Sequence, residues 1–227
     1  MSSASSRVPI LHAVTNDAVV RRGDFVASAI GVMRAGGSRV AIHLRSSVLT
    51  GRELFHLTEL LVAQQAATGA WVVVNGRPDI AAAAGARAAQ LTSRSIAVGD
   101  ARIAAPAIAV GASVHGLAEA LAAARDGADW VVAGHVFDTP SHQDAPRRGL
   151  ALIGEIATQC SVPVIAIGGV LAEHMATLRA HGAHGAAAIR GVWRDRAENA
   201  ERAAVEYLSA HDASVRAPGD DRAHDQR

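Results

Sequence analysis

The chain has 227 residues, 50% of them hydrophobic, and a formal net charge of +1 when histidine is neutral. Such a chain can bury one sizeable core, and its weak charge predicts no strong attraction to nucleic acid. All 22 of its lysine-plus-arginine residues are arginines. Schiff-base, pyridoxal-phosphate and P-loop chemistries each need a lysine and are therefore excluded.

The sequence predicts a cytoplasmic location. No apolar run reaches the roughly 18 residues of a membrane span, and the first residues lack the apolar core of a secretion signal. The single cysteine, Cys160, excludes an internal disulfide and a cysteine-based metal site. We expect neither a membrane nor a nucleic-acid partner, while a homodimer stays open.

Short apolar runs alternate with helical patterns along the chain. Strands are expected over residues 10–14, 39–44, 71–74, 88–91, 107–110, 130–133, 164–167 and 186–189. Helices are expected over residues 24–33, 50–68, 78–84, 150–159, 171–180 and 195–210, with a further helix that follows Gly116 and ends at Arg125. The stretch 92–102 has no clear pattern.

Eight strand–helix units in one chain predict a single (β/α)8 barrel over residues 9–211. The main rival is an open doubly wound sheet, but it would place a glycine-rich fingerprint after an early strand, where Thr15-Asn16-Asp17 stands instead. Residues 1–8 are expected to be a flexible N-terminus. Residues 212–227 are polar and charged without an apolar period, which is typical of a disordered tail.

Ligands of a parallel barrel bind where the strands end. The residues expected to follow the eight strands are mostly polar: Thr15, Arg45, Asn75, Thr92, Ser113, His135, Gly168 and Arg190. His135 follows the sixth strand, and an imidazole suits proton transfer near neutral pH, so we predict it as the catalytic residue. The alternatives are a purely structural histidine and, for Arg45, a salt bridge inside the mouth.

Two loops predict a phosphate site. Gly168-Gly169 ends the seventh strand, and Ile189-Arg190-Gly191 ends the eighth. Backbone N–H groups after these two strands are the recurring phosphate site of this fold, and Arg190 adds charge. We therefore predict Gly168, Gly169, Ile189, Arg190 and Gly191 as phosphate-binding residues.

A catalytic metal is not expected. His12, His43 and His135 can all point inward, but no acidic residue accompanies them at the strand ends, and no His-x-His pair is present. The chemistry is expected to need no cofactor.

Several stretches together resemble the thiamine phosphate synthase/TenI superfamily of barrels over about residues 10–209. They are Leu11–Thr15, Ile42–Arg45, Val74–Ile80, Gln90-Leu91, Ser113–His115, Gly134–Phe137, Arg148–Leu150 and Ala166–Gly169. The superfamily contains synthases, which join a thiazole phosphate to a pyrimidine pyrophosphate with magnesium. It also contains TenI-type tautomerases, which aromatise a carboxythiazole phosphate.

The resemblance implies differences from the synthases at the magnesium site. Synthases carry a glutamine where His43 stands, a lysine shortly after it, an aspartate where Gly76 stands and another in the stretch that corresponds to 92–95. Both magnesium-binding carboxylates are thus missing. Ser46 stands where TenI proteins tend to carry an acidic residue.

Other motifs favour the tautomerase. Gly134-His135 and Asn75-Gly76-Arg77 are TenI features, and Thr139-Pro140-Ser141 resembles the thiazole-phosphate segment of synthases. The resemblance implies an isomerase in which His135 shuttles a proton on a thiazole phosphate. The substrate contacts would come from Arg45, Asn75, Ser113, Thr139 and Ser141. The alternatives are a thiamine phosphate synthase and an inactive regulator that binds thiazole phosphate.

Overall fold

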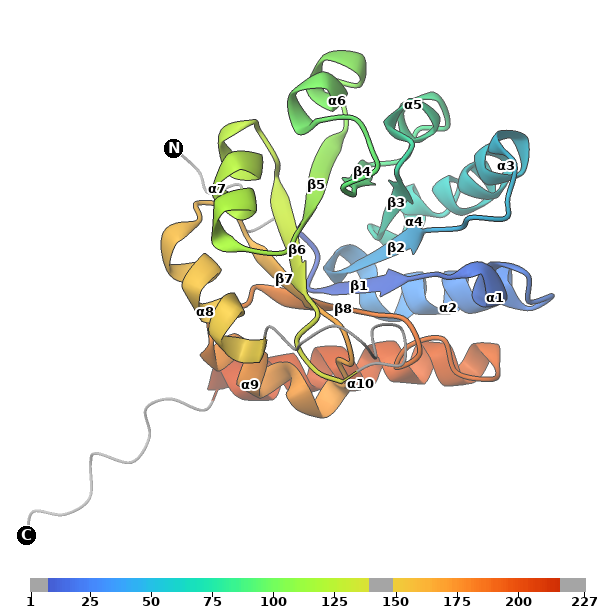
Figure 1. Ribbon diagram of the computed structural model, residues 1–227. Coiled ribbons are helices and arrows are strands. Elements are labelled where there is room, and N and C mark those ends of the chain that lie inside the picture. The colour runs from blue at the N-terminus through green and yellow to red at the C-terminus, as the bar shows by residue number, and fades with distance from the viewer. Residues whose placement is uncertain (1–7, 139–148, 217–227) are drawn as a thin grey trace, which may run out of the picture.

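The computed structural model describes residues 8–138 and 149–216, which form a closed barrel of eight parallel strands in chain order (Figure 1). The strands are β1 (Leu11–Val14), β2 (Val40–Leu44), β3 (Trp71–Asn75), β4 (Ala88–Leu91), β5 (Ala109–Val114), β6 (Trp130–Gly134), β7 (Val164–Ile167) and β8 (Gly185–Ala188). His12 of β1 is in register with Ala41 of β2 and with Ala187 of β8, which closes the ring. The predicted (β/α)8 barrel is confirmed, and the open sheet is excluded.

The helices lie outside the ring of strands (Figure 1). They are α1 (Asp17–Val20), α2 (Phe25–Gly36), α3 (Gly51–Val62), α4 (Gln65–Thr68), α5 (Pro78–Ala83), α6 (Val98–Ala104), α7 (Leu117–Arg125), α8 (Gly149–Gln159), α9 (Met175–Ala180) and α10 (Ala197–Arg216), with short 3-10 turns η2 (Gly37–Arg39) and η4 (Ala172–His174). A capping box starts α3, since Thr50 and Glu53 cap each other. Across the described ranges, no helix combines the length and apolar character needed to span a membrane.

The barrel has two apolar layers. One lies between the strands and the helices, where α10 packs along α2. The other fills the inside of the ring around the fully buried Trp130, with Val73, Ile165 and Ala187 among its members. Strands buried on both faces explain why the apolar runs in the sequence are continuous.

The fifth strand differs from the prediction. It runs over Ala109–Val114 rather than 107–110, so Ser113 lies inside the strand and not in the loop after it. The sequence did not predict the second half of this strand, because the small residues Gly111 and Ala112 give no strong apolar pattern. The structure explains them: a Cβ on Gly111 would overlap the indole of Trp130 and the amide of Gln90. A further helix, α6, begins in the stretch 92–102, where no pattern was visible, and ends at Ala104.

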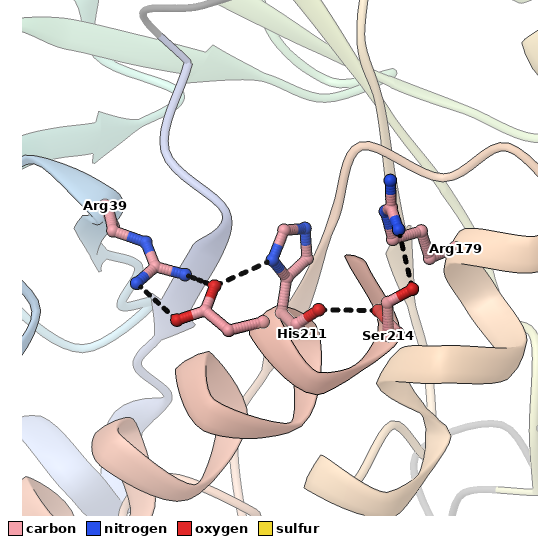
Figure 2. Close-up of polar contacts among 5 residues, drawn as sticks. Arg39, Arg179, His211 and Ser214 are labelled. Atoms are coloured by element: carbon pink, nitrogen blue, oxygen red, sulfur yellow. Dashed lines mark hydrogen bonds and ion pairs between the residues drawn. The ribbon is translucent and has the colours of Figure 1, made fainter. Parts of the chain in front are cut away.

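The last helix is longer than predicted. The tail was expected from residue 212, but α10 continues to Arg216. Figure 2 shows why: Arg39 and Asp212 form an ion pair at 2.5 Å, and Arg179 of α9 donates to the Ser214 carbonyl oxygen at 2.9 Å. These bonds connect the end of α10 to the residue before β2 and to α9. The rest of the predicted tail, 217–227, and residues 1–7 lie outside the described residues.

A methyl group at position 111 should destabilise the barrel. Gly111→Ala places its Cβ against Trp130 and Gln90, and overpacking of this kind costs about 1–3 kcal/mol of unfolding free energy. Gly99→Ala in α6 is the matched control, because no other atom lies within 4 Å of the added Cβ. That change should leave stability equal or raise it slightly. Urea unfolding of both variants measures the difference, and an undiminished midpoint for Gly111→Ala would contradict this packing.

Candidate functional site

A cavity of about 280 Å³ opens where β7 and β8 end. We call it the β7–β8 pocket. It is lined by Asn16, Asp138, Ile167, Gly168, Gly169, Val170, Leu171, Ala187, Ala188, Ile189, Arg190 and Gly191. The five residues predicted to bind phosphate therefore lie around one cavity.

Glycines are needed at the end of β7 for two reasons. Gly168 and Gly169 have φ values of +102° and +65°, in the region that favours glycine. A Cβ on Gly168 would also overlap His135, and one on Gly169 would overlap Phe137 and Asp138. The close approach is fastened by the Phe137 N–H, which donates to the Gly168 carbonyl oxygen at 2.9 Å. The loop after β6 is thus held against the pocket wall.

The other wall depends on the last helix. A Cβ on Gly191 would overlap the hydroxyl of Tyr207, which reaches in from α10 and donates to the Val170 carbonyl oxygen at 2.7 Å. Burial raises the pKa of this phenol, so it stays a neutral donor. Arg190 lies exposed at the rim, where its guanidinium can meet an anion in the pocket.

A second cavity, of about 180 Å³, opens beside the first. We call it the β1–β4 pocket. It is lined by Asn16, Asp17, Arg45, Ser46, Ser47, Asn75, Gly76, Thr92 and Arg94. Asn16 lines both pockets, so the two form adjacent parts of one mouth.

Thr15 positions Arg45 in this second pocket. Its hydroxyl donates to the Arg45 carbonyl oxygen at 2.9 Å and accepts from the Arg45 N–H at 2.8 Å. The ends of β1 and β2 are therefore joined by one buried side chain. The salt bridge considered for Arg45 from the sequence is not among the ion pairs of the described residues.

The sequence analysis missed Asp17. It had found no acidic residue at the strand ends, yet this carboxylate lines the β1–β4 pocket. Asp17 accepts hydrogen bonds from the Ser47 hydroxyl at 2.5 Å, from the Ser47 N–H at 2.7 Å and from the Ser46 hydroxyl at 2.9 Å, and these bonds lower its pKa to about 2. The signal was the short distance in sequence from β1, together with Asn16, which caps α1 by accepting from the Val19 N–H.

A chain of buried side chains connects the barrel interior to this pocket. His12 Nε2 lies 3.0 Å from the Pro9 carbonyl oxygen, and His12 Nδ1 lies 2.7 Å from His43 Nε2. His43 Nδ1 in turn lies 3.2 Å from the Asn75 side chain. Burial lowers the pKa of both histidines, that of His43 to about 4, so both rings are neutral at pH 7.

The remaining predicted residues are placed less directly. Ser113 accepts from the Gln90 amide at 3.1 Å and lines neither pocket. His135 is half-buried behind Gly168, and its catalytic role stays a prediction. Thr139 and Ser141 lie outside the described residues.

The site does not fit the magnesium ion that the synthases of the superfamily are expected to use. Gly76 and Thr92 bring no carboxylate to the β1–β4 pocket, and its one acid, Asp17, already accepts from Ser46 and Ser47. Within residues 8–138 and 149–216, no group of three histidine, cysteine or acidic side chains is arranged to hold a metal ion. Magnesium at phosphate sites is usually held by one or two carboxylates together with water and substrate phosphates, and the only carboxylate lining this pocket is occupied by its hydrogen-bond donors. No step of a reaction is therefore assigned to a protein-bound metal.

The fold and mouth define a (β/α)8 barrel with a cavity after its last two strands, which is where barrels of this fold commonly bind phosphate. A family model described as thiamine monophosphate synthase matches residues 11–192, and the chain belongs to this family. It is 39% identical over 181 residues to a thiamine-phosphate synthase of Methanoculleus marisnigri, covering 79% of this chain and 85% of that protein. A thiamine-phosphate synthase of Chlorobium luteolum is 36% identical over 176 residues, with 77% and 82% covered.

A solved structure agrees with these relatives. The thiamine phosphate pyrophosphorylase from Pyrococcus furiosus superposes with a TM-score of 0.80 at 28% identity, covering 94% of this chain and 100% of that one.

These relatives overturn the expected tautomerase, and with it the isomerase class. The two relatives described above are named thiamine-phosphate synthases, which are transferases and not isomerases. The prediction was wrong because it gave the differences at His43, Gly76 and His135 more weight than the similarity along the whole barrel.

Acid should destabilise the fold through His12 and His43. Burial holds their pKa values below the ordinary 6.5, so between about pH 6.5 and 4 the unfolded chain binds protons that the folded chain does not. The free energy of unfolding should therefore fall as the pH falls through this window, by at most about 1.4 kcal/mol per pH unit for each histidine.

Urea unfolding at several pH values measures this dependence. His211 contributes in the same direction, because burial lowers its pKa too. The comparison is therefore made in a His211→Asn background, with and without His43→Gln. An equal pH dependence in both proteins would contradict the assignment to His43.

Proposed function

We propose that this protein is a thiamine-phosphate synthase that joins a thiazole phosphate to a pyrimidine pyrophosphate. The observation that supports this best is the β7–β8 pocket, which places all five predicted phosphate-binding residues together in a chain whose relatives are named synthases. The adjacent β1–β4 pocket supplies a second position for a charged substrate.

The thiazole phosphate belongs in the β7–β8 pocket. Three glycines, Gly168, Gly169 and Gly191, line it, so backbone N–H groups can approach phosphate oxygens closely there. Arg190 adds a cation at the rim. The thiazole ring then lies toward Asn16, where the two pockets meet.

The pyrophosphate belongs in the β1–β4 pocket. Arg45 and Arg94 line it, and guanidinium groups bind phosphate oxygens through paired hydrogen bonds. In the reaction, the thiazole nitrogen forms a bond to the methylene carbon of the pyrimidine substrate. The carbon–oxygen bond breaks, and its electron pair leaves with pyrophosphate. Arg45 and Arg94 would stabilise the charge that develops on this leaving group.

A second candidate is a protein that binds thiazole phosphate without turnover. The observation in its favour is the lack of carboxylates at Gly76 and Thr92, where the synthases of the superfamily are expected to hold magnesium. Such a protein would keep the β7–β8 pocket and would not form thiamine phosphate.

Removal of the Arg190 charge should weaken phosphate binding. Arg190→Gln is expected to lower the affinity for thiazole phosphate by roughly three- to tenfold, because this exposed charge is partly screened by solvent. Arg125→Gln is the control, since that side chain is 75% exposed at the end of α7, away from the mouth. Calorimetric titration measures both affinities. An equal change in the two variants would contradict the phosphate site.

Thiamine phosphate should form from the two precursors, at comparable rates with magnesium and with a chelator. The reason is that Arg45 and Arg94, rather than carboxylate-bound magnesium, supply positive charge in the β1–β4 pocket. Arg94→Gln should slow product formation by roughly tenfold, because Arg94 is exposed and solvent partly screens its charge. Product measured by liquid chromatography tests this.

The outcomes separate the candidates. Product only with magnesium would contradict the role given to the arginines. No product under either condition, with thiazole phosphate still bound in calorimetry, would leave the binding protein as the function.

A further inference from the structure

Three side chains inside the barrel form one line of contacts that ends at the mouth. The line runs from the Pro9 carbonyl oxygen through His12 and His43 to Asn75, with contacts of 3.0, 2.7 and 3.2 Å. His12 is fully buried and His43 is 1% exposed, so water cannot replace these partners. Asn75 is half-buried and lines the β1–β4 pocket.

The direction of the hydrogen bonds along this line, from donor to acceptor, is set at its buried end; we call this direction its polarity. The Pro9 carbonyl oxygen can only accept, so His12 Nε2 must bear the hydrogen. Since His12 is neutral, its Nδ1 has a lone pair and accepts from His43 Nε2. His43 is neutral too, so its Nδ1 is also an acceptor.

Asn75 must therefore donate to His43. The amide atom that faces His43 Nδ1 at 3.2 Å is Oδ1, which would place two acceptors against each other. The two ends of an asparagine amide have nearly the same shape, and the hydrogen-bond network decides their positions. A half-turn of the amide puts Nδ2 against His43 and turns Oδ1 toward the pocket.

We propose that Pro9, His12 and His43 act as a positioning relay that fixes the Asn75 carbonyl oxygen toward the β1–β4 pocket. The pocket then presents a hydrogen-bond acceptor beside Arg45 and Arg94. It selects a ligand that combines an anionic group with a nearby N–H or O–H donor. Asn75 is the specificity-determining residue, and the two histidines act through it.

The relay also deepens the proposed function, on which this step rests. In a pyrimidine pyrophosphate, the arginines hold the anionic end, and the Asn75 oxygen accepts from an exocyclic amino group on the ring. An analogue with a methoxy group at that position offers no donor. It would set an acceptor against the Asn75 oxygen and be disfavoured.

The opposite polarity has a definite signature. If His43 were doubly protonated, it would donate to Asn75 Oδ1, and the amide NH2 would face the pocket. The pocket would then prefer a ligand acceptor. Such a cation would have to remain charged in a fully buried site next to His12, against the desolvation that lowers its pKa.

Nuclear magnetic resonance of the free, ¹⁵N-labelled protein tests the relay without any ligand. At pH 7, the relay makes both histidines neutral Nε2–H tautomers. It also makes two N–H···N hydrogen bonds, which give nitrogen–nitrogen couplings from His43 Nε2 to His12 Nδ1 and from Asn75 Nδ2 to His43 Nδ1. A protonated His43 Nδ1, or the lack of the Asn75 coupling in the folded protein, would overturn the proposal.

Asn75→Asp, which has nearly the same shape, is expected to change the protonation of His43. A carboxylate can only accept, so His43 Nδ1 must then gain a proton, and the pKa of His43 should rise relative to the unchanged protein. An unchanged His43 titration in this variant would also overturn the relay.

A pair of variants at position 43 tests the consequence for ligands. In His43→Gln, the amide nitrogen can donate to His12 and the amide oxygen can accept from Asn75, so the polarity is kept. In His43→Leu, the polarity is lost. The unchanged protein and His43→Gln should bind the amino pyrimidine pyrophosphate about five- to tenfold more tightly than its methoxy analogue, and His43→Leu should not.

The two kinds of failure can be told apart. No preference in the unchanged protein, with the couplings present, would overturn the selection by Asn75. Failure of the proposed function would appear instead as no thiamine phosphate in the activity assay, with the couplings and the binding preference intact.

Discussion

The indole of Trp130 fills the middle of the barrel, and much of the interior depends on it. It is fully buried and packs near His12 and Trp71, with ring centroids 5.8 and 6.2 Å away. The absence of a side chain at Gly111 makes room for it. An aromatic ring of this size in a closed ring of short strands leaves little freedom to its neighbours, since protein interiors are close-packed.

Groups that can only donate, or only accept, a hydrogen bond set the orientation of neighbouring groups that can do both. The Trp130 N–H can only donate, so it holds the Gln90 amide oxygen at 2.9 Å and turns the Gln90 nitrogen toward Ser113. The Pro9 carbonyl oxygen can only accept, and it fixes the polarity of His12 in the same way. An unpaired buried polar group has a large desolvation cost. Each group in these two chains of hydrogen bonds therefore takes the donor or acceptor role that its neighbour leaves to it. The barrel interior is thereby coupled to the chemistry of its mouth.

The parts of the fold that follow from apolar periodicity were predictable from the sequence. The eight units and the loops at Gly168-Gly169 and Ile189–Gly191 are local patterns, and the structure places them as expected. Ser113 was predicted in a loop rather than in β5. The strand was not recognised because its residues are small, and they are small because the indole of Trp130, 17 positions after Ser113 in the chain, needs the space. Asp17 was missed for a similar reason: its partners Ser46 and Ser47 come from the next strand's loop. Such features depend on contacts between distant segments, which a local pattern does not contain.

The tautomerase prediction was wrong for a different reason. Gly76 does differ from the family's magnesium site, but a missing carboxylate does not by itself change the class of reaction. In the proposed synthase reaction, positive charge near the leaving pyrophosphate would come from guanidinium groups, which need no carboxylate partner. Asp17 stays ionised, because hydrogen bonds from Ser47 and Ser46 lower its pKa. With Arg45 and Arg94 on the other walls, the pocket keeps one net positive charge. The same barrel can thus hold the same kind of anion with cations that are part of the chain.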